Sequence, residues 1–291
     1  MQTRTVHHIR YALPEVTLLQ DSGIGVAEIA ARTCYDSFAH SENEAIRRAA
    51  ETIDTQAINL IDDSELLQSL AWVYHHHSII EHTVLSYLVR GTSRGVLQEH
   101  ARHRIQSLSV RSTRYTMSSI LHAFVAAIRS GGSDGLFAEE SRKLFIELVQ
   151  PLDLLVVADP SYQAIEIGAM YDKLKYQHDQ DPDAFVDAAI AKSSRELIDQ
   201  YGTDGAGLFA AFEAGKKKRN VGDAFKHIVT DNWKVDMVVT FNLRSLKNYI
   251  DLRTSGAAWF QINWLAEAMK AVTPPKYLRL IDKHYNQYTE T

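Results

Sequence analysis

The chain has little cysteine, no long apolar run and no excess of positive charge. Its single cysteine, Cys34, excludes an intramolecular disulfide and fits a reducing compartment. No apolar run approaches the roughly eighteen residues of a transmembrane helix, and the N-terminus lacks the apolar core of a signal peptide. The formal net charge of -5 argues against a protein that binds nucleic-acid phosphates over its whole surface. We therefore expect a cytoplasmic protein.

Apolar spacing along the 291 residues indicates both strands and helices, as in an α/β (α+β) fold. β-Prone runs predict strands at 16–19 and 83–89. Helical spacing predicts helices at 26–34, 42–60, 64–74, 139–150, 222–229, 242–253 and 257–272, and one amphipathic helix within 182–201. Ser64 can cap the helix at 64–74, and Thr254 or Ser255 can cap the last one. A further helix is expected from a cap at Ser93 to about Arg104, followed by a serine-rich loop.

The most unusual stretch of the sequence runs from Arg102 to Tyr115. Its fourteen residues contain four arginines, one histidine, three serines and one threonine. Unpaired guanidinium groups are too costly to bury, so these side chains cannot form a core. Arginine forks and serine hydroxyls suit phosphate or carboxylate groups. The alternatives are a solvated basic loop and a site for a small anion.

Two further polar clusters flank this stretch. Four histidines and Glu81 lie between 74 and 82, but the His-Glu-x-x-His spacing of a zinc site is absent, so we expect no metal. A bland alternative is that Glu81 and His82 form a polar pair before a strand. The basic run at 216–219 is interpreted as a solvated loop between helices rather than a phosphate site.

A polar helix is predicted at 242–253. Asn242 and Arg253 are eleven residues apart, about three turns, and therefore share a face. Arg244 and Asn248 are four apart and share another face. An arginine and an amide on each face suggest a helix between two ligands. The alternative is an ordinary surface helix.

The order of these residues resembles that of the flavin-dependent thymidylate synthases. Arg102-His103-Arg104, seven residues and then Ser112 match the Arg-His-Arg-x7-Ser signature of that family. Residues 76–82 are similar to its His-x-Ser/Thr-x-x-Glu-His motif. Residues 242–253 match its Asn-x-Arg-x-Leu-x-Asn/His motif with an arginine five positions further on. The resemblance covers about two thirds of the chain, and is weakest at 117–200, where we find no chemistry.

The resemblance implies one domain, residues 1–291, with a mixed central sheet flanked by long helices. It also implies a homotetramer whose subunits share active sites. The residues implied to bind the flavin are Ser78, Arg102, His103, Arg104, Asn242, Arg244 and Asn248. Those implied to bind the nucleotide are Glu99, Arg102, Arg111, Ser112, Thr113, Arg114, Lys226 and Arg253. Arg253 would also activate the pyrimidine, because an arginine at the ring edge stabilises negative charge there.

The implied reaction is the C5 methylation of dUMP to dTMP. The carbon would come from 5,10-methylenetetrahydrofolate, and the hydride from FAD that NADPH has reduced. Three departures from the family pattern bear on this expectation: Val110 replaces a frequent glutamate or glutamine, Ala257 replaces a frequent histidine, and residues 258–262 match only loosely.

These departures leave other functions open. One is a relative that methylates another pyrimidine nucleotide, such as UMP to 5-methyl-UMP. Another is a flavin-binding relative without catalysis. A third, from a different class, is a nucleic-acid-binding module that uses the basic loop and binds with a steep salt dependence, although the net charge counts against it.

Overall fold

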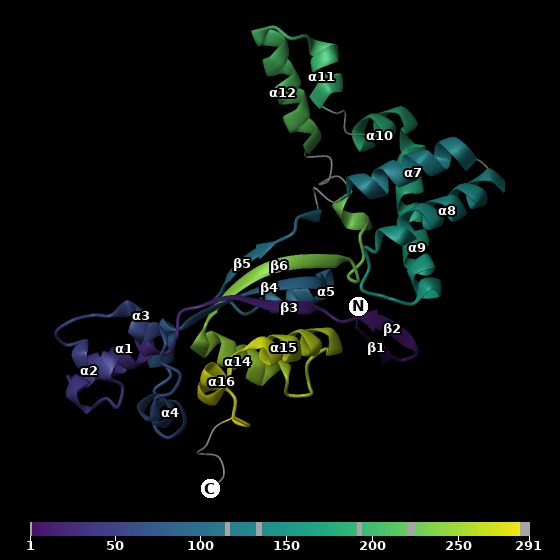
Figure 1. Cartoon of the computed structure of the whole chain (residues 1–291). Helices are drawn as coiled ribbons and strands as arrows, with labels where there is room; N and C mark the ends of the chain where they lie inside the picture. The colour runs from purple at the N-terminus through teal and green to yellow at the C-terminus, as the bar shows by residue number, and fades with distance from the viewer. Residues whose placement is uncertain (1, 114–116, 132–135, 191–193, 220–224, 286–291) are drawn as a thin grey trace. The chain divides into compact units, whose positions relative to one another are not determined.

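Chain contacts divide the protein into two units, which are drawn together in Figure 1. The computed structural model describes residues 2–113, 117–131, 136–190, 194–219 and 225–285. The sheet unit comprises residues 13–110 and 235–291, and the helical unit comprises residues 1–12 and 111–234. That the whole chain is one domain stays a prediction. None of the described helices is long and apolar enough to cross a membrane.

The sheet unit is built on four strands in the order β3-β4-β6-β5. They are β3 (Glu15–Asp21), β4 (Val84–Ser93), β6 (Lys234–Asn242) and β5 (Ser107–Val110). Buried and more exposed side chains alternate along these strands. In β4, Leu85, Tyr87 and Val89 are buried, while the residues between them are more exposed. The expected fold class is confirmed. The pairs β3–β4 and β5–β6 are both antiparallel, so the mixed strand directions that we expected are not seen in these two pairs.

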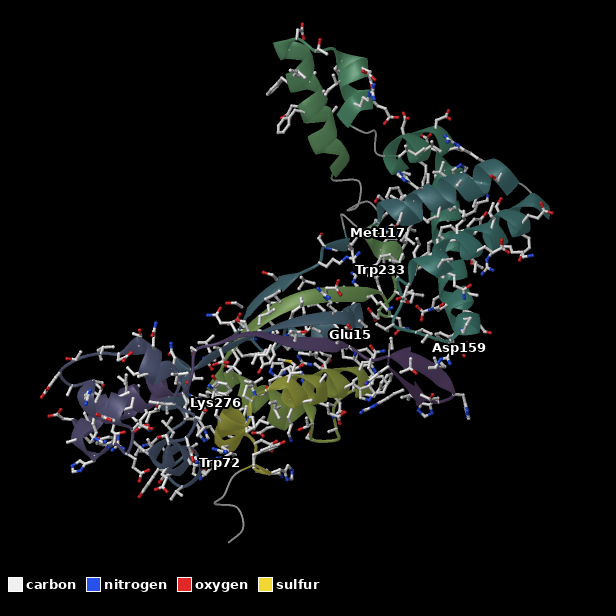
Figure 2. All side chains as sticks on the ribbon, viewed as in Figure 1. Glu15, Trp72, Met117, Asp159, Trp233 and Lys276 are labelled. Carbon is white, nitrogen blue, oxygen red and sulfur yellow. The ribbon has the colours of Figure 1, made fainter. Side chains whose placement is uncertain are left out.

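Three helices after β6 lie along one face of this sheet: α14 (Leu243–Arg253), α15 (Phe260–Val272) and α16 (Pro275–Ile281) (Figure 1). Side chains fill the space between them and the strands (Figure 2). Helix α15 was expected to begin at Ala257 with Thr254 or Ser255 as its cap. Instead it begins at Phe260, and Thr254 ends α14 by donating from Oγ1 to the carbonyl of Ile250 over 2.8 Å.

Four short helices precede β4: α1 (Gly25–Tyr35), α2 (Glu44–Arg48), α3 (Thr55–Asn59) and α4 (Glu65–Trp72). The single helix expected at 42–60 is wrong, because the Asp54 carboxylate accepts from the N–H groups of Gln56 and Ala57 and starts α3 separately. Ser64 caps α4 as expected, with Oγ accepting from the N–H of Leu67. Trp72, labelled in Figure 2, donates from Nε1 to the Arg279 carbonyl over 2.6 Å and ties α4 to α16.

The helical unit combines a hairpin with a set of helices. The hairpin strands are β1 (Thr3–Val6) and β2 (Ile9–Ala12), and the helices are α7 (Ser118–Gly131), α8 (Leu136–Val149), α9 (Pro160–Gln180), α10 (Pro182–Ala189), α11 (Ser194–Tyr201) and α12 (Gly205–Arg219). The core contains an aromatic cluster in which the ring of Phe124 contacts Phe145, Tyr171 and Phe185.

Three expectations for the helical unit are corrected. The stretch 182–201, which is expected to contain one helix, contains two, α10 and α11. The basic run at 216–219 belongs to α12 and is not a loop between helices. At 222–229 the described part forms only the short 3-10 helix η4 (Lys226–Ile228). By contrast, the helix expected at 139–150 is α8, which ends before Pro151 as proline requires.

Candidate active site

A tight turn after helix α5 (Arg94–His100) presents the Arg-His-Arg sequence. Ser93 caps this helix as expected, with Oγ accepting from the N–H of Val96 over 3.1 Å. The helix ends at His100 and does not continue to Arg104, because the His100 carbonyl accepts from the His103 N–H and from Nε2 of Gln106, each over 3.0 Å. The next residues form β5, not the expected loop, because pairing with β6 holds them as a strand.

Helix α14 supplies the second set of polar side chains. Asn242 is its cap: Oδ1 accepts from the N–H of Ser245 over 2.8 Å. This capping bond alone explains an asparagine at this position, so no ligand is needed to explain it. Arg244, Asn248 and Asp251 follow at helical spacing and share a face, as i, i+4 and i+7 positions do.

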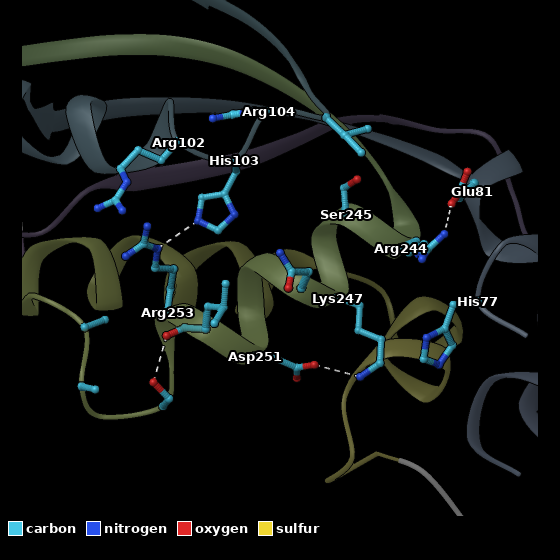
Figure 3. A pocket seen from close by; sticks show the side chains of 16 residues that line it. His77, Glu81, Arg102, His103, Arg104, Arg244, Ser245, Lys247, Asp251 and Arg253 are labelled. Carbon is cyan, nitrogen blue, oxygen red and sulfur yellow. Dashed lines mark hydrogen bonds and ion pairs between the residues drawn. The ribbon is translucent and has the colours of Figure 1, made fainter. Parts of the chain in front are cut away.

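The turn and helix α14 border one cavity of about 1100 Å³ within the sheet unit. Its lining residues are His77, Glu81, Arg102, His103, Arg104, Ile105, Arg244, Ser245, Lys247, Asn248, Asp251, Leu252, Arg253, Ser255, Ala257 and Ala258 (Figure 3). Five of these carry a positive charge and two a negative charge, so the cavity is electropositive although the whole chain is acidic. Such a cavity favours an anionic ligand.

Arg253 is held at one end of this cavity by three hydrogen bonds. It donates from Nε to Nε2 of His103 over 3.0 Å (Figure 3). One terminal nitrogen donates to Oε2 of Glu99 over 2.9 Å, and the other donates to the Glu99 carbonyl over 3.2 Å. Its side chain is only 15% exposed. Asn263 donates to the Arg253 carbonyl over 3.0 Å. The guanidinium is therefore fixed in place before any ligand binds.

His103 must be neutral to take part in this arrangement. Its Nε2 accepts the Arg253 bond, so the ring carries its proton on Nδ1. Burial lowers the pKa of His103, and the charges of Arg253 and Arg102 lower it further, against an opposing effect of Glu99. The environment of the ring thus favours the form that accepts from Arg253.

Two ion pairs at the other lining positions were missed at the sequence level. Arg244 pairs with Glu81, and Lys247 donates from Nζ to Asp251 over 2.9 Å (Figure 3). Lys247 also lies 4.6 Å from the Trp72 ring centre. Glu81 thus pairs with Arg244, whereas the sequence suggests His82 as one alternative partner. The i, i+4 spacing of Lys247 and Asp251 on one helix could have predicted the second pair.

The structure brings together some of the expected site residues and leaves others elsewhere. The expected residues in the cavity lining are Arg102, His103, Arg104, Arg244, Asn248 and Arg253, and Glu99 contacts the last of these. Ser78 and Asn242 belong to the sheet unit but are not among the lining residues. Arg111, Ser112, Thr113 and Lys226 belong to the helical unit, and Arg114 lies outside the described residues.

Comparison with known proteins gives one consistent family. The model of the thymidylate synthase complementing protein family matches residues 17–275. The flavin-dependent thymidylate synthase of Wolinella succinogenes is 25% identical over 268 residues, which is 90% of this chain and 94% of that protein. The enzyme of the same name from Helicobacter pylori is 24% identical over 268 residues, covering 92% and 97%.

A solved structure shares the fold. The crystal structure of thymidylate synthase X from Helicobacter pylori with FAD and dUMP has a TM-score of 0.57 and 22% identity, covering 94% of this chain and 99% of that one. The family match spans most of the sequence, and the curated relatives cover nearly all of it. The chain therefore belongs to the thymidylate synthase complementing protein family, the family of the flavin-dependent thymidylate synthases.

Proposed function

We propose that this enzyme methylates C5 of dUMP to give dTMP, with 5,10-methylenetetrahydrofolate as carbon donor, FAD as hydride donor and NADPH as the reductant of the flavin. One observation carries the proposal: an electropositive cavity with the largely buried, fixed Arg253 at its edge. The names of the curated relatives support the same reaction.

The lining residues fit the chemistry of FAD. The pyrophosphate of that cofactor needs charge-assisted donors, and the side chains of Arg102, Arg104 and Arg244 supply them from two elements. The Asn248 amide, on the same face as Arg244, can bond to a ring or ribose oxygen. A bound FAD, once NADPH has reduced it, would supply the hydride that completes the methyl group. The lining residues themselves bind and orient the cofactor.

The role proposed for Arg253 is electrostatic. Three of the five N–H groups of its guanidinium are engaged with His103 and Glu99, which leaves two to donate to a ligand. C5 of a pyrimidine becomes nucleophilic when negative charge on the N3/O4 side of the ring is stabilised. A fixed cation that is only 15% exposed stabilises such charge more than one in water, and needs no reorganisation.

The nucleotide phosphate is assigned to a second group of residues, on the basis of the family resemblance. Arg111, Ser112, Thr113, Arg114 and Lys226 would hold it. Because that family shares its sites among four subunits, we propose a homotetramer in which these residues complete the cavity of a neighbouring copy. Sedimentation velocity of the purified protein tests this: a tetramer is expected, and a monomer that still turns over the nucleotide would contradict it.

The test of the reaction is spectroscopic first and catalytic second. The purified protein is supplied with FAD, and its visible spectrum is recorded while dUMP or UMP is added separately. We expect a bound-flavin spectrum that dUMP perturbs, and labelled dTMP when NADPH and 5,10-methylenetetrahydrofolate are added. If the enzyme methylates UMP and not dUMP, its substrate is the ribonucleotide. Absence of FAD binding would overturn the proposal, and tight oligonucleotide binding without FAD would favour the nucleic-acid alternative.

A further inference from the structure

Two buried polar side chains lie next to the cavity lining without being part of it. His100 ends helix α5, Tyr249 lies within α14, and both residues are 0% exposed. Nδ1 of His100 and the hydroxyl of Tyr249 are 3.2 Å apart, a hydrogen bond whose donor depends on the histidine tautomer. Their rings meet edge to face with centroids 5.0 Å apart. The polar pair is therefore enclosed in the core of the sheet unit.

Tyr249 connects His100 to the candidate active site. Its ring meets that of His103 edge to face at 4.7 Å, and rests against Phe241 at 5.3 Å. Phe241 also meets the ring of His100 at 5.7 Å. His103 in turn accepts from Arg253 through Nε2. A continuous series of contacts thus runs from His100 through Tyr249 and His103 to the Arg253 guanidinium.

We propose that the His100–Tyr249 pair is a positioning device, which fixes the ring of His103 so that its Nε2 remains the acceptor for Arg253. The hydrogen bond holds the Tyr249 ring, and the Tyr249 ring limits rotation of His103. A His103 ring that changed tautomer would point an N–H at the Nε–H of Arg253, and a ring that turned over would present a C–H there, so in neither case could His103 accept the bond. The guanidinium would then lose one of its three fixing bonds.

A neutral His100 is essential to this arrangement. Burial lowers its pKa to about 4, and the neighbouring His103 and Arg253 act in the same direction. Two other charged groups lie close to His103: Glu99 of α5, and Arg102 in the turn that follows α5. At neutral pH the His100–Tyr249 pair therefore adds no charge to the site. Its contribution is geometric.

The experiment replaces both members of the pair by apolar side chains of similar shape, in the double variant His100→Leu with Tyr249→Phe. Removing both partners avoids the unpaired buried group that either change alone would leave, so the fold should hold. Long-range proton–nitrogen NMR on protein with labelled histidine reports the His103 tautomer. The matched control is Tyr87→Phe, which removes a buried phenol oxygen bonded to Thr273 over 2.8 Å in the same unit, away from the cavity lining.

In the wild type and the control we expect a single His103 tautomer with unprotonated Nε2, and in the double variant a mixture. The effect on turnover rests on the proposed function: kcat for dUMP should fall about tenfold or more, while KM changes less than about threefold. A double variant with an unchanged tautomer and wild-type kcat would overturn the inference. So would a wild-type ring with its proton on Nε2.

If the double variant does not fold, the single variant Tyr249→Phe tests the positioning role. It keeps the ring and loses only the hydroxyl, so a mixed tautomer supports the positioning role and an unchanged one refutes it. The NMR result is independent of catalysis. A variant whose tautomer changes, in a protein whose wild type turns over no dUMP, supports the inference and refutes only the proposed function.

Discussion

Each unit of this chain buries a histidine among aromatic rings, and the two histidines differ in where their polar atoms lead. In the helical unit the ring of His178 meets Phe124 and Phe185, and its Nδ1 bonds over 3.1 Å to Asp179, whose side chain is 45% exposed. In the sheet unit His100 bonds to Tyr249, which packs on the cavity residue His103.

The difference shows that burial of a polar ring has two outcomes in one chain. The helical unit directs its polar atom to the surface, and its aromatic cluster serves stability. The sheet unit pairs its polar atoms with each other inside the core, and the Tyr249 ring packs on a residue of the electropositive cavity, so its cluster serves the site as well. Substitutions in the aromatic cluster around Tyr249 should therefore change function more than those in the cluster around Phe124, which should mainly change stability.

The largest effect is expected for Arg253→Ala. It removes the fixed cation from the cavity, and kcat should fall by about 10³ or more while FAD still binds. Steady-state kinetics and flavin titration measure the two quantities. The control is Arg48→Ala, which removes an arginine whose side chain is 74% exposed and paired with Glu44. Normal turnover by the Arg253 variant would show that the site is assigned wrongly.

The helical unit offers the converse test, Phe124→Ala. Phe124 is 0% exposed, so the change should lower the free energy of unfolding by about 3–5 kcal/mol. The affinity for FAD of the folded protein should remain within about twofold of the wild type. Chemical denaturation and flavin titration measure these. Phe209→Ala is the matched control, because Phe209 is 67% exposed and its removal should cost less than about 0.5 kcal/mol. Loss of FAD binding in the Phe124 variant would break the comparison.

Acid should destabilise the protein through His100. Its pKa is about 4 in the folded chain and 6.5 ordinarily, so between these values the unfolded chain binds more protons. The stability that depends on neutral His100 is therefore complete above pH 6.5 and is lost as the pH falls toward 4, by up to about 3 kcal/mol. Denaturant unfolding at a series of pH values measures the slope. His100→Leu should flatten that slope whatever its effect on stability at neutral pH, and an unchanged slope would contradict the prediction.

Local signals were sufficient for much of the fold. Strands β3 and β4 and helices α1 and α4 follow from β-prone runs, helical spacing and the cap at Ser64. The β1–β2 hairpin was missed because its turn uses His7 and His8, both with positive φ, where asparagine or glycine is usual. The strand β5 was missed because a serine-rich segment has low strand propensity and only pairing with β6 determines its structure.

The site could be predicted only as far as its residue types. The Arg-His-Arg signature and the spacing on α14 identified most of the charged lining residues. They could not show that Asn242 caps a helix or that Glu81 pairs with Arg244, because each requires contacts that the fold creates. The role of His100 was hidden for the same reason: Tyr249, its hydrogen-bond partner, is 149 positions away in the sequence.

The smallest effect is expected at the edge of the cavity, where two variants distinguish the charge of Arg244 from its ion pair with Glu81. Arg244 and Glu81 are 55% and 42% exposed at their side chains, so their ion pair should contribute less than about 1 kcal/mol to stability. Arg244→Ala should instead weaken FAD binding about tenfold, because it removes a charge-assisted donor. Glu81→Gln removes a competing anion and leaves the arginine, so it should leave FAD affinity unchanged or raise it. If both variants weaken binding equally, the ion pair matters and the cation alone does not. The difference between them should also shrink at high salt, since exposed charges are screened.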